Sequence, residues 1–242
     1  MERVAVIVQA RMGSTRLPGK VLMPLGGQTA LAQCLRRCQA IPGIDVVVCA
    51  VPEGNADDAI AAEALKSGVQ VVRGSASDVL SRYHKAAQTV GADWIMRVTS
   101  DCPLIDPKVC GDILHLAQSQ KLDYACNNLP PTWPHGLDAE VFSFAMLDKA
   151  FHAATDPFER EHVTPWIRNN PNAKTGNVAR AGESLAETCR WTLDYPEDYA
   201  FLRALFDLLP DGAGTEDVLA LLAAHPDLGE INAQHHGVRA KR

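Results

Sequence analysis

The chain has 242 residues, of which 47% are hydrophobic, and its formal net charge is −6. This length and composition suffice to bury one large core, so we expect a single domain over residues 1–242. The acidic balance argues against a general nucleic-acid-binding protein, which normally carries a basic excess. The first apolar run ends at Gln9 and is too short for a signal-peptide core or a transmembrane helix. We therefore expect a cytoplasmic protein with neither nucleic acid nor membrane as partner.

The seven cysteines show neither a paired framework nor a Cys-x-x-Cys metal motif. We interpret them as reduced and mostly buried thiols. The chain ends in the basic run Arg239–Arg242, and we expect residues 233–242 to form a flexible tail.

Strand patterns alternate with helical patterns over the first half of the chain. The predicted strands are 4–8, 45–51, 69–72 and 93–98. The predicted helices between them are 28–39, 56–66 and 78–90. Such alternation is typical of a parallel sheet covered by helices and joined by right-handed crossovers. Ligands of these sheets bind at the carboxyl ends of the strands.

The second half of the chain is less regular. It predicts helices at 107–118, 144–154, 159–169, 197–208 and 216–224, and strands at 124–127, 140–144, 176–179 and 190–193. The irregular stretch resembles an insertion that shapes a substrate pocket. We expect a substrate-facing and dimerisation lobe at about 123–190, within a three-layer α/β/α domain whose mostly parallel sheet has about seven strands.

Residues 9–20 follow the first strand directly and have the character of a phosphate-binding loop. Small side chains at Ala10, Gly13 and Ser14 let backbone N–H groups approach an anion. Three cations lie in the same run: Arg11, Arg16 and Lys20. Because the chain as a whole is acidic, this local positive charge indicates a bound polyanion.

The loop is not a Walker P-loop. That motif needs four residues between its first Gly and the Gly-Lys pair, followed by Ser or Thr. Here five residues separate Gly13 from Gly19, and Val21 follows Lys20. Pro18 lacks an N–H and disfavours helix at the residue before it, which favours an extended loop. An ordinary basic surface loop is the alternative interpretation.

The loop resembles the N-terminal motif of the nucleotide-activated sugar cytidylyltransferases. It is similar to the loop of the acylneuraminate and 3-deoxy-manno-octulosonate cytidylyltransferases, and most closely resembles the spore-coat polysaccharide biosynthesis protein F branch. The resemblance runs from about residue 4 to 206 through five further motifs: Arg73–Ser75, Arg97–Leu104, Gly136–Phe142, Glu159–Pro165 and Trp191–Asp198. It implies a Rossmann-like α/β fold of the nucleotide-diphospho-sugar transferase type with a small substrate lobe.

Two aspartates are candidate metal ligands. In nucleotidyl transfer an acceptor oxygen attacks the α-phosphorus of a nucleoside triphosphate and pyrophosphate leaves, and carboxylates can help by binding Mg²⁺. Asp101 lies at the predicted end of the fourth strand, and Asp194 comes just before Pro196. The resemblance implies that both hold one or two Mg²⁺ ions. From the residues alone, Asp101 could be a turn or capping residue and Asp194 could cap the helix that Pro196 begins.

The resemblance also assigns the phosphate contacts. It implies that Arg11 and Lys20 contact the triphosphate of CTP, and with Asp101 they are the predicted catalytic residues. Arg16 could join them or form a structural salt bridge. Close backbone or hydroxyl contacts are expected from Ala10, Gly13 and Ser14.

Base and acceptor contacts are expected from later motifs. The resemblance places Arg73 and Ser75 at the cytosine, although the acceptors that an arginine reads on cytosine do not exclude uracil. Arg160 could hold the carboxylate of an acidic sugar, or 159–162 could be the charged first turn of a helix. The expected acceptor residues are Asn127, Asn128, His135, Gly136, Asp138, Glu140, Arg160, Glu161 and His162.

The resemblance implies a Mg²⁺-dependent cytidylyltransferase that forms a CMP-activated sugar, with an acidic sugar as the expected acceptor, for bacterial surface polysaccharide synthesis. Known relatives often form homodimers, and we expect one here. One alternative is a glycosyltransferase that consumes a nucleotide sugar, although Pro103 stands where an Asp-x-Asp metal motif would need its second Asp. Another is a catalytically silent nucleotide-binding scaffold subunit, although Arg11, Lys20, Asp101 and Asp194 are all present.

Overall fold

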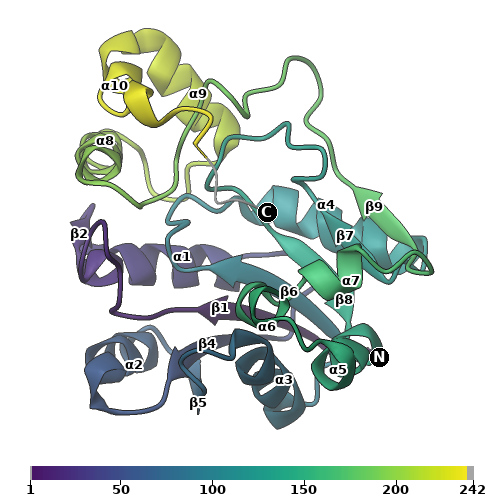
Figure 1. Cartoon of the computed structure of the whole chain (residues 1–242). Coiled ribbons are helices and arrows are strands. Elements are labelled where there is room, and N and C mark those ends of the chain that lie inside the picture. Colours follow the sequence, from purple (N-terminus) through teal and green to yellow (C-terminus); the bar gives the residue numbers. More distant parts are fainter. Residues whose placement is uncertain (1, 239–242) are drawn as a thin grey trace.

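The computed structural model describes residues 2–238 and is built around a seven-stranded sheet with the order β5-β4-β1-β6-β8-β7-β9 (Figure 1). The strands are β1 (Val4–Gln9), β4 (Val46–Pro52), β5 (Gln70–Gly74), β6 (Trp94–Thr99), β7 (Tyr124–Cys126), β8 (Glu140–Ser143) and β9 (Thr175–Asn177). Within the described sheet, β8 alone runs antiparallel to its neighbours. The prediction of a mostly parallel sheet is confirmed, and a short hairpin of β2 (Pro24–Leu25) and β3 (Gln28–Thr29) lies apart from it.

Helices cover both faces of the sheet. Those of the main domain are α1 (Ala30–Gln39), α2 (Asp58–Lys66), α3 (Val79–Val90), α4 (Pro107–Ser119), α5 (Phe144–Ala153), α6 (Pro157–His162) and α7 (Pro165–Arg168), with short 3₁₀ turns at Lys20–Leu22 and Asn55–Asp57. In β1, Val6 and Val8 pack in the core with α1, α2 and α4, whereas Ala5 and Ile7 pack with α3 and α5. Because successive strand residues point to opposite faces, this uninterrupted apolar run is buried on both sides. The three-layer α/β/α prediction is confirmed.

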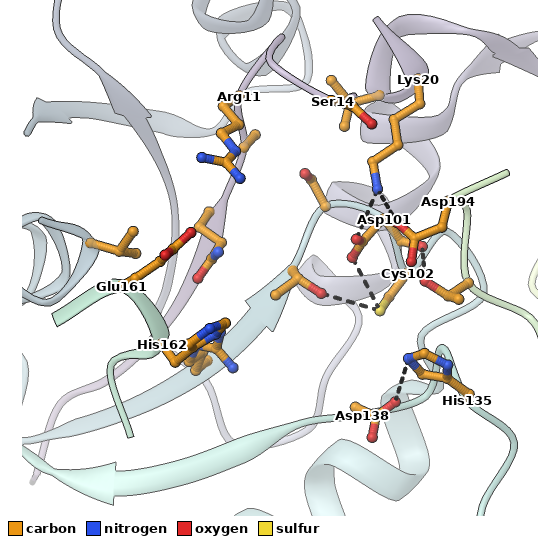
Figure 2. A pocket seen from close by; sticks show the side chains of 18 of the residues that line it. Arg11, Ser14, Lys20, Asp101, Cys102, His135, Asp138, Glu161, His162 and Asp194 are labelled. Carbon is orange, nitrogen blue, oxygen red and sulfur yellow. Dashed lines mark hydrogen bonds and ion pairs between the residues drawn. The ribbon is translucent and has the colours of Figure 1, made fainter. Parts of the chain in front are cut away.

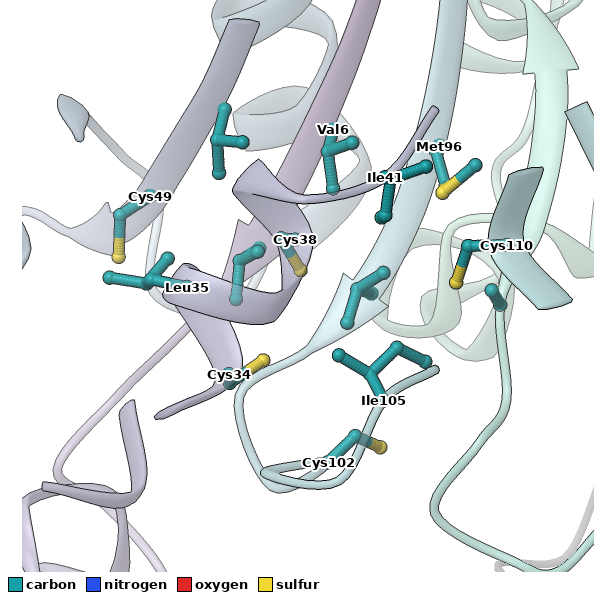
Figure 3. Packing of buried hydrophobic residues seen from close by; sticks show 14 of the residues in the cluster. Val6, Cys34, Leu35, Cys38, Ile41, Cys49, Met96, Cys102, Ile105 and Cys110 are labelled. Carbon is teal, nitrogen blue, oxygen red and sulfur yellow. The ribbon is translucent and has the colours of Figure 1, made fainter. Parts of the chain in front are cut away.

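The cysteines belong to the packing of the sheet. All seven are free, and six of them are buried. Burial raises the pKa of Cys49 to about 12, so that thiol stays protonated. Five share the core on the α1 side of the sheet (Figure 3): Cys34, Cys38, Cys49, Cys102 and Cys110. The prediction of buried, unpaired thiols is confirmed.

A separate core cluster joins the C-terminal helices to the main domain. The helices are α8 (Pro196–Phe206), α9 (Thr215–Ala224) and α10 (Pro226–Glu230), which lie together at the top of Figure 1. They bury apolar side chains against Leu25, Leu104, Trp191 and Leu193. This packing holds the segment around residue 194 close to the turn that follows β6.

Two predicted elements differ from the structure. Residues 190–193 form no strand, although an isolated bridge joins Arg190 to His135. The N–H groups of Trp191 and Leu193 donate to the loop carbonyls of His135 and Asp101 instead of to a sheet neighbour. The single helix predicted at 159–169 is divided into α6 and α7, because Pro165 has no N–H to continue the first helix and begins the second.

The predicted substrate lobe and flexible tail also take definite places. Strands β7, β8 and β9 of the stretch 123–190 extend the main sheet. Of the predicted tail, residues 233–235 form a 3₁₀ turn, and the carbonyl of Val238 accepts a hydrogen bond from buried Arg190. These contacts place residues 233–238 against the domain, while residues 239–242 of the predicted flexible tail lie outside the described part. None of the helices between residues 2 and 238 combines the length and apolarity that crossing a membrane requires.

Candidate active site

A cavity of about 810 Å³ opens where β1 and β6 end. Gln9 and Thr99, the last residues of these two parallel strands, both line it. Figure 2 shows Lys20, Asp101 and Asp194 gathered on one side and Glu161 and His162 on the other. The volume lies in the range of small-molecule sites, at the strand edge where α/β sheets bind ligands.

Hydrogen bonds to Asp57 and within the loop itself fix the shape of the basic loop. The N–H of Met12 donates to Asp57 Oδ1 at 2.6 Å, and the N–H of Leu17 donates to Ser14 Oγ at 3.3 Å. Gly19 has a left-handed backbone conformation, with φ of 71°, and its N–H donates to the carbonyl of Met12. The loop therefore presents its predicted residues to the cavity: Ala10, Arg11, Gly13, Ser14, Arg16 and Lys20.

The two predicted metal ligands converge on one ammonium group. Lys20 Nζ lies 3.0 Å from Asp101 Oδ2 and 2.7 Å from Asp194 Oδ1. The carbonyl of Asp101 accepts from Thr192 Oγ1 and from the N–H of Leu193, which ties the two aspartate segments together. These bonds explain how residues so far apart in sequence meet.

The charges of this triad shift its pKa values in opposite directions. Burial lowers the pKa of Lys20, but the carboxylates of Asp101 and Asp194 raise it more, to a net value above its usual one. Burial raises the pKa of Asp101, but the ammonium of Lys20 and a hydrogen bond from Thr99 hold it well below its usual range. Asp101 and Lys20 are therefore both charged at neutral pH.

The donor set fits Mg²⁺ bound together with a phosphate ligand. Among the described residues, no cluster of three or more His, Cys, Asp or Glu side chains could hold a metal on its own. Mg²⁺ commonly uses one or two carboxylates and completes its shell with water and substrate phosphates. Asp101 and Asp194 already converge on a cation, and the basic loop beside them is suited to the phosphates.

Arg16 forms a structural salt bridge and also faces the cavity, where it could contact phosphate. Its guanidinium lies 3.1 Å from Asp194 Oδ2 and over the ring of Tyr195, 5.0 Å from the ring centre. It also lines the cavity with its side chain half exposed. An arginine held in this way can stabilise Asp194 and still offer donors to a phosphate.

Three predicted acceptor residues form a polar wall. Asn128 Nδ2 donates to Asp138 Oδ1 at 3.0 Å, and His135 Nε2 lies 4.0 Å from Asp138 Oδ2. Gly136 makes this wall possible, because a Cβ there would lie 2.5 Å from the backbone nitrogen of Thr192. The close approach brings the wall next to the aspartate segment.

Glu140 lies at the base of the acceptor side and is 4% exposed. Its carboxylate accepts from Arg97 at 2.5 Å, Tyr124 at 2.6 Å and Thr164 at 2.7 Å. Burial raises the pKa of Glu140, but the charge of Arg97 and these hydrogen bonds bring it below its usual value. Glu140 reaches the cavity lining, yet most of its bonding capacity goes to holding β6, β7 and α7 together.

Helix α6 brings Glu161 and His162 to the opposite wall. His162 lies beside the ring of Phe158, with ring centres 4.4 Å apart. Burial lowers the pKa of His162, and the charges of Arg97 and Arg168 lower it further. A neutral imidazole at this position can donate or accept a hydrogen bond from a sugar hydroxyl.

Five predicted contacts do not line the cavity in this structure: Arg73, Ser75, Asn127, Gly136 and Arg160. The expected base contact Arg73 pairs with Asp58 at 2.5 Å and donates to the carbonyl of Gly54 at 2.8 Å. Ser75 Oγ accepts from the N–H of Asp78, which places it in the turn before α3. In this structure both side chains have partners within the protein, and their contacts with cytosine stay a prediction of the resemblance.

Asn127 and Arg160 have structural partners instead of an open face to the acceptor. Asn127 is buried, and its amide bonds the backbone of Leu137 and Ala139. Arg160 holds Asp78 with two nitrogens, at 2.9 and 2.6 Å, and also donates to two backbone carbonyls. Its guanidinium joins α6 to the start of α3, and its role as the carboxylate binder stays a prediction.

Four arginines line the cavity that the motifs of the sequence did not indicate as site residues: Arg82, Arg97, Arg168 and Arg190. Arg82 is 2% exposed and donates to the carbonyl of Ser75, and its Nε has no partner among the described residues. Burial lowers its pKa, and the charge of Arg11 lowers it further. One signal was present in the sequence, because Arg97 interrupts an otherwise apolar strand; Arg82 lies in a helix with no local motif.

Comparison with known proteins identifies the family. A family model described as cytidylyltransferase matches residues 5–205. The spore coat polysaccharide biosynthesis protein SpsF of Bacillus subtilis is 34% identical over 238 residues, which cover 94% of this chain and 97% of that protein. A 3-deoxy-manno-octulosonate cytidylyltransferase of an Anaeromyxobacter species is 38% identical, with 100% of this chain and 88% of that protein covered.

Solved structures agree with this assignment. A cytidylyltransferase from Leptospira borgpetersenii has a TM-score of 0.90 and 32% identity, covering 99% of this chain and all of that one. A CMP:2-keto-3-deoxy-manno-octonic acid synthetase in complex with CTP shares the fold, with a TM-score of 0.64, 17% identity, and coverage of 85% of this chain and 99% of that one. The chain therefore belongs to the cytidylyltransferase family of enzymes.

Proposed function

We propose that the protein is a Mg²⁺-dependent cytidylyltransferase that transfers CMP from CTP to an acidic sugar and releases pyrophosphate. The observation that carries this proposal is the convergence of Asp101 and Asp194 on Lys20, beside a loop that adds Arg11 and Arg16. Facing carboxylates and cations suit a metal-bound triphosphate better than a neutral ligand. The names of the SpsF and 3-deoxy-manno-octulosonate relatives support a role in polysaccharide synthesis.

The residues of the cavity divide the chemistry between them. Arg11, Arg16 and Lys20 would neutralise the triphosphate and the departing pyrophosphate, while Asp101 and Asp194 would hold the metal. A bound Mg²⁺ supplies positive charge at the phosphoryl group under attack. Because an acceptor oxygen can displace pyrophosphate directly, the protein needs no nucleophile of its own.

An acidic acceptor is supported by the charges on the other wall. Arg97 and Arg168 both lie close enough to His162 for their charges to lower its pKa, while Glu161 and Glu140 raise it. Glu140 neutralises Arg97 in part, and Arg168 lines the cavity. A carboxylate could pair with the guanidinium of Arg168, and the Asn128 wall can bond sugar hydroxyls.

The test is release of pyrophosphate in the presence of Mg²⁺, with CTP, UTP, ATP and GTP in separate reactions. Each triphosphate is combined with acidic sugars, neutral sugars or phosphonates, and a reaction without acceptor is the control. We expect release only with CTP and an acidic sugar. Release with another triphosphate would contradict the assignment of the base, and CTP binding without turnover across the panel would favour a nucleotide-binding scaffold.

A further inference from the structure

The C-terminal segment Asn232–Val238 reaches the active site, although the family model ends at residue 205. The segment follows α10 and contains the 3₁₀ turn Ala233–His235. Its last described residue, Val238, lines the cavity together with Arg190 and Asp194. The side chains of Asn232 and His235 and the carbonyl of Val238 contact residues that in turn hold the proposed metal ligand Asp194 and the proposed phosphate ligand Arg16.

The first contact is with a buried charge network behind Asp194. Arg190 is 2% exposed in its side chain, donates to both oxygens of Asp198, and lies 3.3 Å from Asp194 Oδ2. Asp198 Oδ2 also accepts from the N–H of Asp194 at 3.0 Å. Arg190 and Asp198 therefore fix both the carboxylate and the backbone of the metal-ligand residue.

The segment completes this network. Asn232 is 1% exposed, and its Nδ2 donates to Asp198 Oδ1 at 3.0 Å and to the carbonyl of Arg190 at 2.9 Å. The carbonyl of Val238 accepts from Arg190 Nη1 at 2.7 Å. Without these partners, the buried carbonyl of Arg190 and one N–H of its guanidinium would lose their hydrogen bonds, and among the described residues Asp198 Oδ1 would keep only Arg190 Nε. Such a loss is costly and allows the groups to reorient.

The second contact supports Arg16. The ring of His235 stacks on Tyr195, with ring centres 3.9 Å apart and planes at 8°, and its Nε2 lies 3.1 Å from Glu197 Oε2. Arg16 lies over the same Tyr195 ring. The imidazole thus holds the platform on which this phosphate-loop arginine rests.

We propose that Asn232 and His235 are positioning residues of the active site: through Arg190 and Tyr195 they hold Asp194 and Arg16 in the orientation that receives the metal and the triphosphate. This role rests on the proposed function in that it needs a site for metal and triphosphate, but it can hold even if the proposed transfer to a sugar does not.

The experiment compares His235→Ala, His235→Phe and Asn232→Ala with wild type and with His225→Ala, which removes an exposed imidazole nearby in the same C-terminal region. Calorimetry gives the Kd for CTP with and without chelator, electron paramagnetic resonance gives the Kd for Mn²⁺, and kinetics separates KM for CTP from kcat. Thermal unfolding is recorded for each variant, so that a loss of fold is recognised.

We expect His235→Ala to weaken CTP binding about threefold, with His235→Phe restoring it because the stack on Tyr195 remains. Asn232→Ala should weaken Mn²⁺ binding about tenfold and raise the metal concentration needed for half activity. His225→Ala should match wild type in every measurement.

Unchanged Kd values for CTP and Mn²⁺ in folded His235→Ala and Asn232→Ala would overturn the proposal and leave the segment a stabilising role only. Equal losses in His235→Ala and His235→Phe would also contradict it, because the stack would then carry no effect. If wild type binds CTP and the variants differ as expected while no acceptor is turned over, the positioning role stands and the proposed transfer fails. Failure of wild type to bind CTP would overturn both.

Discussion

At the scale of single residues, Asp101 is the most direct test of the proposed metal site. We predict that Asp101→Asn lowers kcat/KM by about 100-fold or more, because the amide keeps the shape but removes the charge that binds Mg²⁺. Circular dichroism should show an unchanged fold. Asp112→Asn is the matched control, since Asp112 is half-exposed on α4 and pairs with Lys108. Near-normal turnover by Asp101→Asn would contradict the metal assignment.

Two arginines distinguish the base contact that the resemblance implies from an arginine that lines the cavity. Arg82 is buried against the cavity beside Arg11, whereas Arg73 is engaged by Asp58. We predict that Arg82→Lys raises KM for CTP about tenfold, because a lysine cannot reproduce the fixed donors of a buried guanidinium. Arg73→Lys should stay within about twofold of wild type. The reverse order in steady-state kinetics would show that Arg73 reaches the nucleotide after all.

How well single residues could be predicted depends on how local their role is. The basic loop was predictable because Arg11, Gly13 and Lys20 lie in one run after one strand. The function of Arg190 was not, because its partners Asp198 and Val238 meet it only in the folded chain. Arg160 and Asn127 belong to recognisable motifs, but a motif does not show whether a side chain faces the cavity or bonds other residues of the protein.

At the scale of elements, the break between α6 and α7 deserves a stability test. Val163 has φ of 70° and ψ of −55°, and the N–H of Thr164 donates to the carbonyl of His162 at 2.8 Å, which is the geometry of a γ-turn. A buried β-branched residue with positive φ is strained by about 1–3 kcal/mol. The turn ends α6 where Glu161 and His162 reach the cavity, and it places Thr164 on Glu140.

We predict that Val163→Gly is more stable than Val163→Ala by about 1 kcal/mol, although both lose the buried methyl groups, because glycine accepts positive φ freely. Urea denaturation of both variants measures the difference. The matched control is Val141, equally buried in β8. There the glycine variant should be the less stable of the pair by about 0.5–1 kcal/mol. The same order at both positions would contradict the strained turn.

The strands and most helices were predictable, because apolar periodicity and capping residues are local properties. Asp78 and Asp106 each cap the helix that the sequence places after them. The γ-turn was not predictable, since nothing in the side chain of Val163 favours positive φ and tertiary packing imposes it. The segment 190–193 has the apolar pattern of a strand, but its residues pack against α8 and bond two loops.

At the scale of the whole molecule, the pH dependence of the stability in acid follows from carboxylates whose pKa values lie below their usual range in the folded protein. Besides Asp101, these include Asp106, which caps α4 and bonds Thr215, and Glu140 beneath the acceptor wall. The unfolded chain binds protons on such groups at higher pH than the native protein does. Stability is therefore fully present above the unfolded pKa values and falls as the pH drops through the native ones. The lowered pKa values of His162 and His236 act in the same direction below about pH 6.5.

We predict that the free energy of unfolding falls between pH 6 and pH 4 and that Glu140→Gln reduces this fall, because the variant has no proton to take up at this position. At pH 7 the variant should be less stable by roughly 3 kcal/mol, since Arg97 is left buried without its counter-charge. Urea denaturation at pH 7, 5 and 4 measures both effects. Glu53→Gln is the control, because Glu53 is largely exposed and its contact with Lys85 is 3.5 Å long. If Glu140→Gln loses as much stability on acidification as wild type does, protonation of Glu140 does not contribute to the loss, and this prediction is contradicted.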